Sequence, residues 1–163
     1  MEKIINVAQF IFEEYKKITK EIIDEMKLHK LLYFSQRECI AITGHELFKE
    51  NFEGWKYGPV CREIRENITP DGLISGNSNE VSEEAMYIVR NIILEYGALA
   101  SWKLSELSHK EISWLNSRKG LNSEENGNRV LELKDIKEDA KKVRPYDHVW
   151  DMYYDEFEDE EVI

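Results

Sequence analysis

Cysteine is scarce in this chain of 163 residues, which contains two, Cys39 and Cys61, and no CxxC pair. This scarcity excludes a zinc ribbon and a small secreted domain stapled by disulfides. Long apolar runs are also missing, because none approaches the roughly 18–20 residues that a membrane-spanning helix needs. Residues 1–17 contain several glutamates and no small-residue cleavage site, unlike a signal peptide. We therefore expect a cytoplasmic protein with two reduced thiols and no membrane association.

Basic residues are outnumbered, since 22 lysines and arginines stand against 33 aspartates and glutamates, a net charge of −11. This balance argues against nonspecific binding to nucleic acid or to an anionic membrane, because both need a basic surface. A basic protein partner would suit the chain better.

The acidic excess is concentrated in residues 145–163, which hold eight acids and no lysine or arginine. Residues 1–144 carry the other 25 acids and all 22 bases, a net charge of −3. We predict a domain over 1–144 and an acidic tail over 145–163. Large apolar side chains recur in the tail at helical spacing, so it either packs on the domain or docks elsewhere. They are Val149, Trp150, Tyr153, Tyr154 and Phe157.

Enzyme motifs are missing as well, since there is no GxSxG elbow, no Walker loop and no HExxH pair. The four histidines are scattered, which disfavours a histidine-based metal site. Asp147, Asp151 and Asp155 could share a helical face, but they lack the calcium-loop pattern, so a solvated acidic face is favoured. We expect no catalytic residue, no cofactor and no metal, in a protein that is not an enzyme.

Two histidines leave a narrower alternative open. His29 follows Leu28 on a predicted helix, where a histidine at the edge of the core, hydrogen-bonded to a neighbour, is expected. His109 lies between two short predicted helices and is expected to be a capping or turn residue. The alternative is a small enzyme that uses either histidine in a cleft.

Apolar residues recur at helical spacing through most of residues 1–144, which predicts a mainly α fold. The first helix is predicted over 2–17, and the second runs from an N-cap at Asp24 to Ile42, before Gly44. Pro59 is expected to open a third helix that ends before a turn at 69–72. Four more helices are predicted over 83–96, with Ser82 as N-cap, and over 101–107, 110–118 and 134–143.

Two stretches depart from helical spacing. Residues 47–55 predict a small patch of two or three short strands, and residues 130–133 predict another. The predicted fold class is therefore mainly α: a compact multi-helix domain with a small β patch and an acidic tail with a helical pattern.

The two short helices within 101–119 carry four bases and two acids and could form a helix-turn-helix. However, Trp114 and Leu115 fall where packing is expected, and the acidic remainder of the chain would repel phosphate. Nucleic acid is not favoured as a partner, and a DNA-binding autoregulator stays an alternative.

Three clusters of residues occur in a characteristic order. The first is MKLHKLLYFSQ at 26–36, and the second is Leu47-Phe48 followed by FEGWKYGPV at 52–60. The third is LSxLSHxExxW at 104–114. In this arrangement, across about residues 4–143, the chain resembles the SocA-like antitoxin family, also called the Panacea domain, and its phage-associated GepA relatives. Gly54 departs slightly from the family pattern, which often has alanine there.

The resemblance implies an antitoxin that neutralises a cognate protein toxin by direct contact. One branch of the family acts instead as a proteolytic adaptor that delivers its toxin to a ClpXP-type protease, and no enzymatic activity is implied. Toxins of the family are diverse, so the sequence does not identify the toxin, and it leaves the oligomeric state open.

The motif residues divide into two predicted roles. A structural role is expected for Leu28, Leu31, Leu32, Gly58, Pro59, Val60, Ser108 and Trp114. Partner binding is the hypothesis for Tyr33, Trp55, Tyr57, His109, Trp150, Tyr153 and Phe157. Trp55 and Tyr57 alternate around Lys56 and would point to the same side of an extended segment. Core packing is the alternative for these aromatic side chains, because aromatics dominate both cores and interfaces.

We expect deletion of residues 145–163 to weaken toxin binding without unfolding the domain, because acids and aromatics suit steering and docking of a partner. Pull-down of the toxin and far-UV circular dichroism of the truncated chain measure the two effects. Loss of the helical signal would show that the tail belongs to the core instead.

Overall fold

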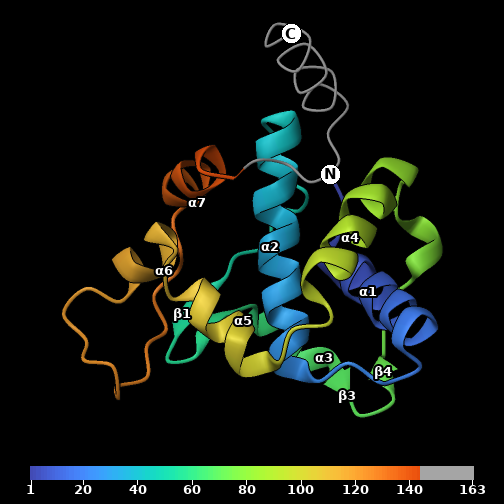
Figure 1. Cartoon of the computed structure of the whole chain (residues 1–163), viewed down its shortest axis with the longest axis horizontal. Helices are drawn as coiled ribbons and strands as arrows, with labels where there is room; N and C mark the ends of the chain where they lie inside the picture. The colour runs from blue at the N-terminus through green and yellow to red at the C-terminus, as the bar shows by residue number, and fades with distance from the viewer. Residues whose placement is uncertain (144–163) are drawn as a thin grey trace, which may run out of the picture.

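A computed structural model describes residues 1–143. The helices within these residues are α1 (Ile4–Thr19), α2 (Glu25–Thr43), α3 (Arg62–Asn67), α4 (Glu83–Tyr96), α5 (Ser101–Ser108), α6 (Ile112–Ser117) and α7 (Leu133–Lys141). Two antiparallel hairpins are formed by β1 (Glu53–Trp55) with β2 (Gly58–Val60), and by β3 (Ile68–Thr69) with β4 (Gly72–Leu73). A short 3₁₀ helix, η1 (Ser78–Glu80), precedes α4. This architecture confirms the predicted mainly α fold class (Figure 1).

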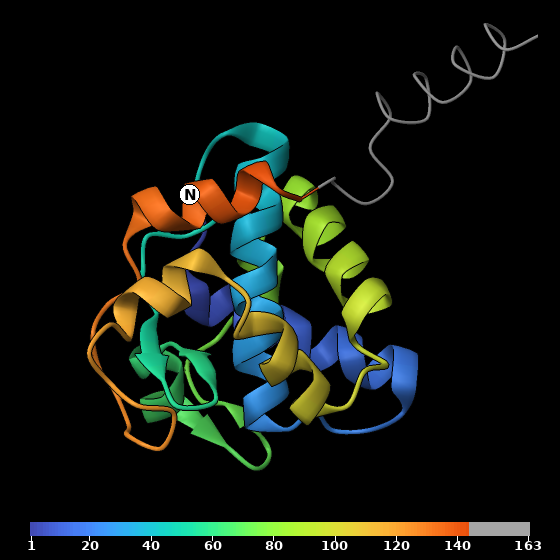
Figure 2. The same ribbon diagram turned by 60° about the vertical axis from the view of Figure 1, so that its left-hand side comes forward.

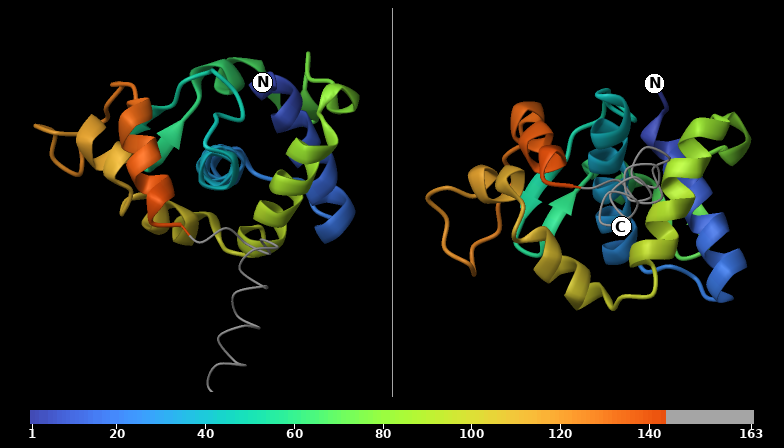
Figure 3. Two further views of the ribbon diagram at one scale, coloured as in Figure 1. Left: turned by 90° about the horizontal axis from the view of Figure 1, so that it is seen from above. Right: turned by 45° about the horizontal axis from the view of Figure 1, so that its top comes forward.

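Helix α2 forms the centre of the molecule. Figures 1 and 2 show it running through the middle, and the left view of Figure 3 looks along it, with the other elements arranged around it. It packs against α1, α4, α5, α7 and β2. Every residue from 27 to 40 is buried, so no face of this stretch meets solvent. Its polar side chains therefore need partners from the surrounding elements.

Local signals place the helix ends as predicted. The Asp24 side chain accepts a hydrogen bond from the Lys27 N–H at 2.8 Å at the start of α2. Gly44 ends this helix at φ +77°, a conformation that glycine adopts without strain. Ser82 accepts from the Ala85 N–H at 3.2 Å and caps α4. The predicted helices over 2–17, 101–107, 110–118 and 134–143 appear as α1, α5, α6 and α7, with ends shifted by two residues at most.

The prediction that Pro59 opens a helix is wrong. Pro59 is the middle residue of β2, which pairs with β1. The chain reverses at residues 56–57. Gly58 follows at φ +125°, a backbone conformation that residues other than glycine rarely adopt. Trp55 is therefore the last residue of β1 and Tyr57 lies in the turn, so the two do not share one extended segment. A proline is tolerated in such a short strand because it needs no ladder hydrogen bond there.

The strand predicted over residues 130–133 is present as a single bridge. Val130 pairs with Glu53 in antiparallel orientation, on the edge of β1 away from β2. The Leu131 N–H donates to the Phe52 carbonyl at 2.8 Å beside this bridge. Helix α7 then begins, so the β patch has two strands and one bridged residue.

A buried carboxylate joins α7 to α6 and α2. Asp139 accepts hydrogen bonds from the N–H groups of Ile112 and Ser113, at 2.7 and 3.0 Å, and thereby caps the start of α6. It also accepts from the Tyr33 hydroxyl at 2.9 Å. Tyr33 has no exposed surface, so its predicted contact with a partner is wrong and the core alternative is right.

A second buried contact joins α2 to Glu111, the residue that precedes α6. Arg37 on α2 forms an ion pair with Glu111 and donates to the Tyr96 hydroxyl at 3.1 Å. Its guanidinium also lies 4.7 Å from the centroid of the Phe34 ring. These contacts hold α4, α6 and α2 together around a largely buried ion pair. None of the helices in residues 1–143 is long and apolar enough to cross a bilayer.

We expect Asp139→Ala to lower the free energy of unfolding by about 3 kcal/mol, because three buried donors lose their acceptor. Urea denaturation measures this change. Glu138→Ala on the same helix is the matched control, since it removes an exposed ion pair with Lys141 and should change stability by about 0.5 kcal/mol or less. Adding Tyr33→Phe to Asp139→Ala should cost less than the sum of the two single effects. Equal stability of the two alanine variants would contradict the network.

Candidate protein-binding pocket

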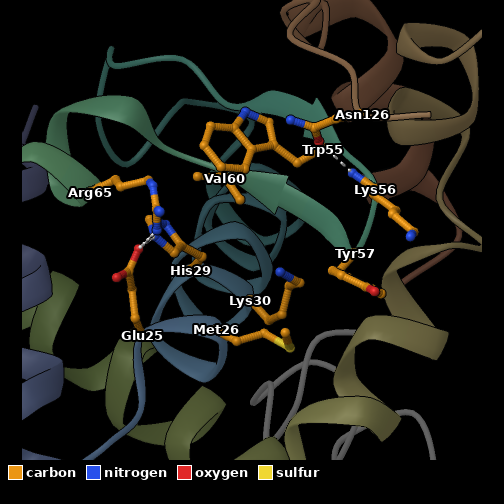
Figure 4. A pocket seen from close by; sticks show the side chains of 10 residues that line it. All are labelled: Glu25, Met26, His29, Lys30, Trp55, Lys56, Tyr57, Val60, Arg65 and Asn126. Atoms are coloured by element: carbon orange, nitrogen blue, oxygen red, sulfur yellow. Dashed lines mark hydrogen bonds and ion pairs between the residues drawn. The ribbon is translucent and has the colours of Figure 1, made fainter. Parts of the chain in front are cut away.

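Two of the three sequence clusters, far apart along the chain, line one pocket. The third packs behind its hairpin wall, where the Trp114 indole N–H donates to the Trp55 carbonyl. We call this pocket the motif pocket, and its volume is about 430 Å³. It lies between the first turns of α2, the β1–β2 hairpin and α3 (Figure 4). The lining residues are Glu25, Met26, His29, Lys30, Trp55, Lys56, Tyr57, Val60, Arg65 and Asn126. Most of the exposed surface inside it is apolar, although several charged side chains surround it.

One wall of the motif pocket is a fixed chain of polar contacts. The Cys61 N–H donates to His29 Nδ1 at 3.2 Å, so the ring proton sits on Nε2 and is donated to Glu25 at 3.1 Å. Burial lowers the pKa of His29, which is therefore neutral at pH 7. The hydrogen bond from His29 lowers the pKa of Glu25, and Arg65 also donates to this carboxylate at 2.8 Å. His29 is thus a core histidine bonded to neighbours, as the sequence predicts.

Lys30 lines the motif pocket, and its side chain appears between those of Met26, His29 and Tyr57 in Figure 4. Only 1% of its surface is exposed. Among the interactions of the described residues, its ammonium makes a single hydrogen bond, of 3.5 Å to the Pro59 carbonyl. The carboxylates of Asp24 and Glu25 attract it, but neither forms an ion pair with it. Burial lowers the pKa of Lys30 to about 8. A buried ammonium so poorly paired costs the fold stability.

The motif glycine makes room for this lysine. A Cβ atom on Gly58 would lie 2.5 Å from Lys30 Cε and 2.6 Å from Ser108 Oγ. Both distances are shorter than real contacts, so any larger residue would push the Lys30 or Ser108 side chain aside, and it would also be strained at φ +125°. Gly58 thus lies between the stem of Lys30 and the Ser108 side chain.

Aromatic side chains from the β1–β2 hairpin form the opposite wall. Trp55 is half-buried, and its indole N–H donates to Glu53 at 2.9 Å. The guanidinium groups of Arg62 and Arg65 lie 5.6 and 5.3 Å from its ring centroid. Tyr57 is 54% exposed at the rim. These two aromatics, both predicted to bind a partner, are therefore brought together on an accessible surface.

His109 lies beside this wall rather than in the pocket lining. It is the C-cap residue of α5, which confirms the prediction of a capping residue. Its ring stacks on Trp114 at a centroid distance of 4.1 Å. Burial lowers the pKa of His109, and within the described residues its Nε2 has no hydrogen-bond partner. Trp114 is buried, as predicted, and donates its indole N–H to the Trp55 carbonyl at 2.8 Å.

Sequence reasoning found some of these residues and missed others. It singled out Trp55 and Tyr57, but not Lys30. A helical wheel places Lys30 on the face opposite Leu28, Leu31 and Leu32, and it is buried only because other elements enclose α2 on every side. The predicted contacts Trp150, Tyr153 and Phe157 lie outside the described residues. The residues that the structure describes contain no group of three or more His, Cys, Asp or Glu side chains able to hold a metal ion.

Comparison with known proteins gives one result. A family model described as antitoxin SocA-like, Panacea domain, matches residues 28–115, more than half of the chain. The matched region runs from the first turn of α2 into α6 and includes all three sequence clusters, apart from two residues at the start of the first. Searches of curated proteins and of solved structures return no match.

We expect Lys30→Met to raise the free energy of unfolding at pH 7, by on the order of 3 kcal/mol for a pKa that falls from 10.5 to about 8. The unfolded chain binds the Lys30 proton more tightly, so between pH 8 and 10.5 the unmodified chain should gain stability as pH rises. The difference between variant and unmodified chain should therefore shrink at pH 10.

Urea denaturation at pH 7 and pH 10 measures this difference. Lys110→Met, at an exposed lysine next to α5, is the matched control and should change stability little at either pH. A Lys30→Met protein that is less stable than the unmodified chain at pH 7 would show that Lys30 stabilises the fold instead.

Proposed function

This chain belongs to the SocA-like antitoxin family, whose members carry the Panacea domain, and from this premise we propose that it neutralises a cognate protein toxin by binding it directly. Family membership supports a role in a toxin–antitoxin system in general. The direct-contact mechanism is supported by the motif pocket. Its combination of an apolar interior, exposed aromatics and a polar rim is the composition of protein-binding hot spots.

The observation that carries the proposal is the exposed position of Tyr57 beside Trp55. Most large aromatics of residues 1–143 are buried, among them Tyr33, Phe34 and Phe48. Tyr57 is instead held at the tip of a tight turn, with 54% of its surface exposed. A rigid turn presents an aromatic side chain with little loss of entropy on binding. The motif pocket is therefore the proposed centre of the toxin contact.

We also propose that the chain acts by binding and not by catalysis. His29, one candidate for a catalytic base, has both ring nitrogens engaged by Cys61 and Glu25. His109 is stacked on Trp114 outside the pocket lining. Neither histidine is placed to exchange a proton with a molecule in the motif pocket.

One of the basic residues on which the DNA-binding alternative depends is not available for phosphate. Arg118, at the end of α6, is buried and donates to the backbone carbonyls of Gly54, Asn122 and Glu125. A guanidinium that holds a loop in this way does not reach phosphate. Direct binding of a toxin is therefore favoured, with the proteolytic adaptor kept as the competing mechanism.

We expect co-expression with the protein encoded next to this chain to restore growth that the neighbour alone arrests. Tyr57→Ala should weaken the binding of that toxin at least about tenfold, as expected for a hot-spot aromatic, and reduce the rescue. Tyr87→Ala is the matched control, because Tyr87 is similarly exposed but lies on α4, away from the motif pocket. Growth assays and calorimetric titration measure the two effects.

The half-life of the toxin separates the two mechanisms. A toxin that is neutralised at unchanged half-life supports direct masking, whereas faster loss of toxin supports the adaptor. Equal weakening by both tyrosine variants would place the contact elsewhere, and absence of binding and rescue together would contradict the antitoxin proposal.

A further inference from the structure

The ammonium of Lys30 is the most unusual group in the described residues. Other buried charges on α2 have good partners, such as Lys27, which donates to the Gly97 carbonyl at 2.9 Å. Lys30 has three N–H donors and uses one, at the long distance of 3.5 Å. Lys30 lines a pocket whose accessible surface is mostly apolar. Such a group destabilises the free protein and gains most from an anion that enters the pocket.

We infer that the motif pocket recognises a carboxylate carried next to an apolar side chain on the toxin, and that the ammonium of Lys30 binds this carboxylate. The inference rests on the proposed function and specifies the chemistry of the partner. A carboxylate would supply the acceptors that Lys30 lacks, through short charge-assisted hydrogen bonds that are strong where water is excluded.

The walls of the motif pocket select the group that carries the carboxylate. Met26, Trp55, Val60 and the Tyr57 ring provide apolar surface around the lysine. The volume of about 430 Å³ lies in the range of ligand pockets and exceeds what a carboxylate alone would fill. An aromatic or aliphatic group beside the carboxylate would occupy the remainder and displace water from the apolar walls.

The neighbouring charges favour a single carboxylate over a phosphate or a cation. The two arginines beside Trp55 are already paired, Arg65 with Glu25 and Arg62 with Glu53, at 2.8–2.9 Å. They are therefore not free for the bidentate contacts by which arginine binds phosphate. Glu25 is likewise paired, because its Oε2 accepts from both His29 and Arg65. The ammonium of Lys30 is then the one poorly paired charge in the pocket lining, and its single positive charge suits a ligand with a single negative charge.

The first arm of the test uses 3-phenylpropionate as the probe and the full chain labelled with ¹³C at the methionine methyl groups. Because Met26 lines the pocket, its methyl signal should shift saturably as the probe is added. The neutral isostere 3-phenylpropionamide should bind at least about tenfold more weakly, since it cannot make charge-assisted hydrogen bonds. This comparison needs no variant and therefore does not depend on the folding of one.

Lys30→Met tests the assignment to Lys30 itself. It should weaken 3-phenylpropionate at least about tenfold and leave the affinity for the amide little changed, whereas Lys110→Met should change neither. Equal affinity of acid and amide for the unmodified chain, or no probe binding, would overturn the inference. Binding that appears only after deletion of residues 145–163 would also overturn it, because the chain's own tail would then be the occupant.

The second arm uses the toxin. Lys30→Met should lower its affinity at least about tenfold and weaken growth rescue, although this variant is expected to be the more stable protein. Toxin affinity unchanged by Lys30→Met would overturn the inference and leave the proposed function standing. Failure of the unmodified chain to bind the toxin would instead overturn the proposed function, whatever the probe shows.

Discussion

The structure depends on the burial of the polar side chains of α2. A helix enclosed on every side for fourteen residues cannot send its lysines, glutamine and arginine to water, so each needs an acceptor or donor from another element. Lys27 finds the Gly97 carbonyl after α4, and Gln36 finds the Phe48 carbonyl before β1. These contacts require their partners at fixed positions, and the shell of helices and hairpins is thereby aligned on α2.

The same constraint explains the corner formed by α6 and α7. Helix α6 has six residues and no capping side chain of its own, and Asp139 on α7 supplies the missing acceptor. Because Asp139 also receives the Tyr33 hydroxyl, the most distant helix in sequence is fixed to α2. Tyr33 is thus a buried donor in a network and not an anchor for a partner, a distinction that depends on residues 106 positions apart.

Lys30 is a buried charged residue of α2 whose pairing is poor, and we relate this poor pairing to the proposed function. Its ammonium has one long contact where its neighbours on α2 have short ones. Gly58 leaves room for its stem, so the lysine fits sterically although its ammonium is poorly paired. A site that keeps a charge underpaired in the free protein lowers its stability and retains binding energy for a partner. The exposed Tyr57 at the rim fits the same interpretation.

The sequence by itself determined the mainly α class, the caps at Asp24, Gly44 and Ser82, and the family, because these depend on local hydrogen bonds, periodicity and residue order. Tertiary structure decided what the sequence left open or misplaced. Pro59 joined a strand because Gly58 at positive φ reversed the chain, against the local preference of proline for a helix start. The motif pocket could not be predicted either, because burial, pairing and exposure are set by packing between segments distant in the chain.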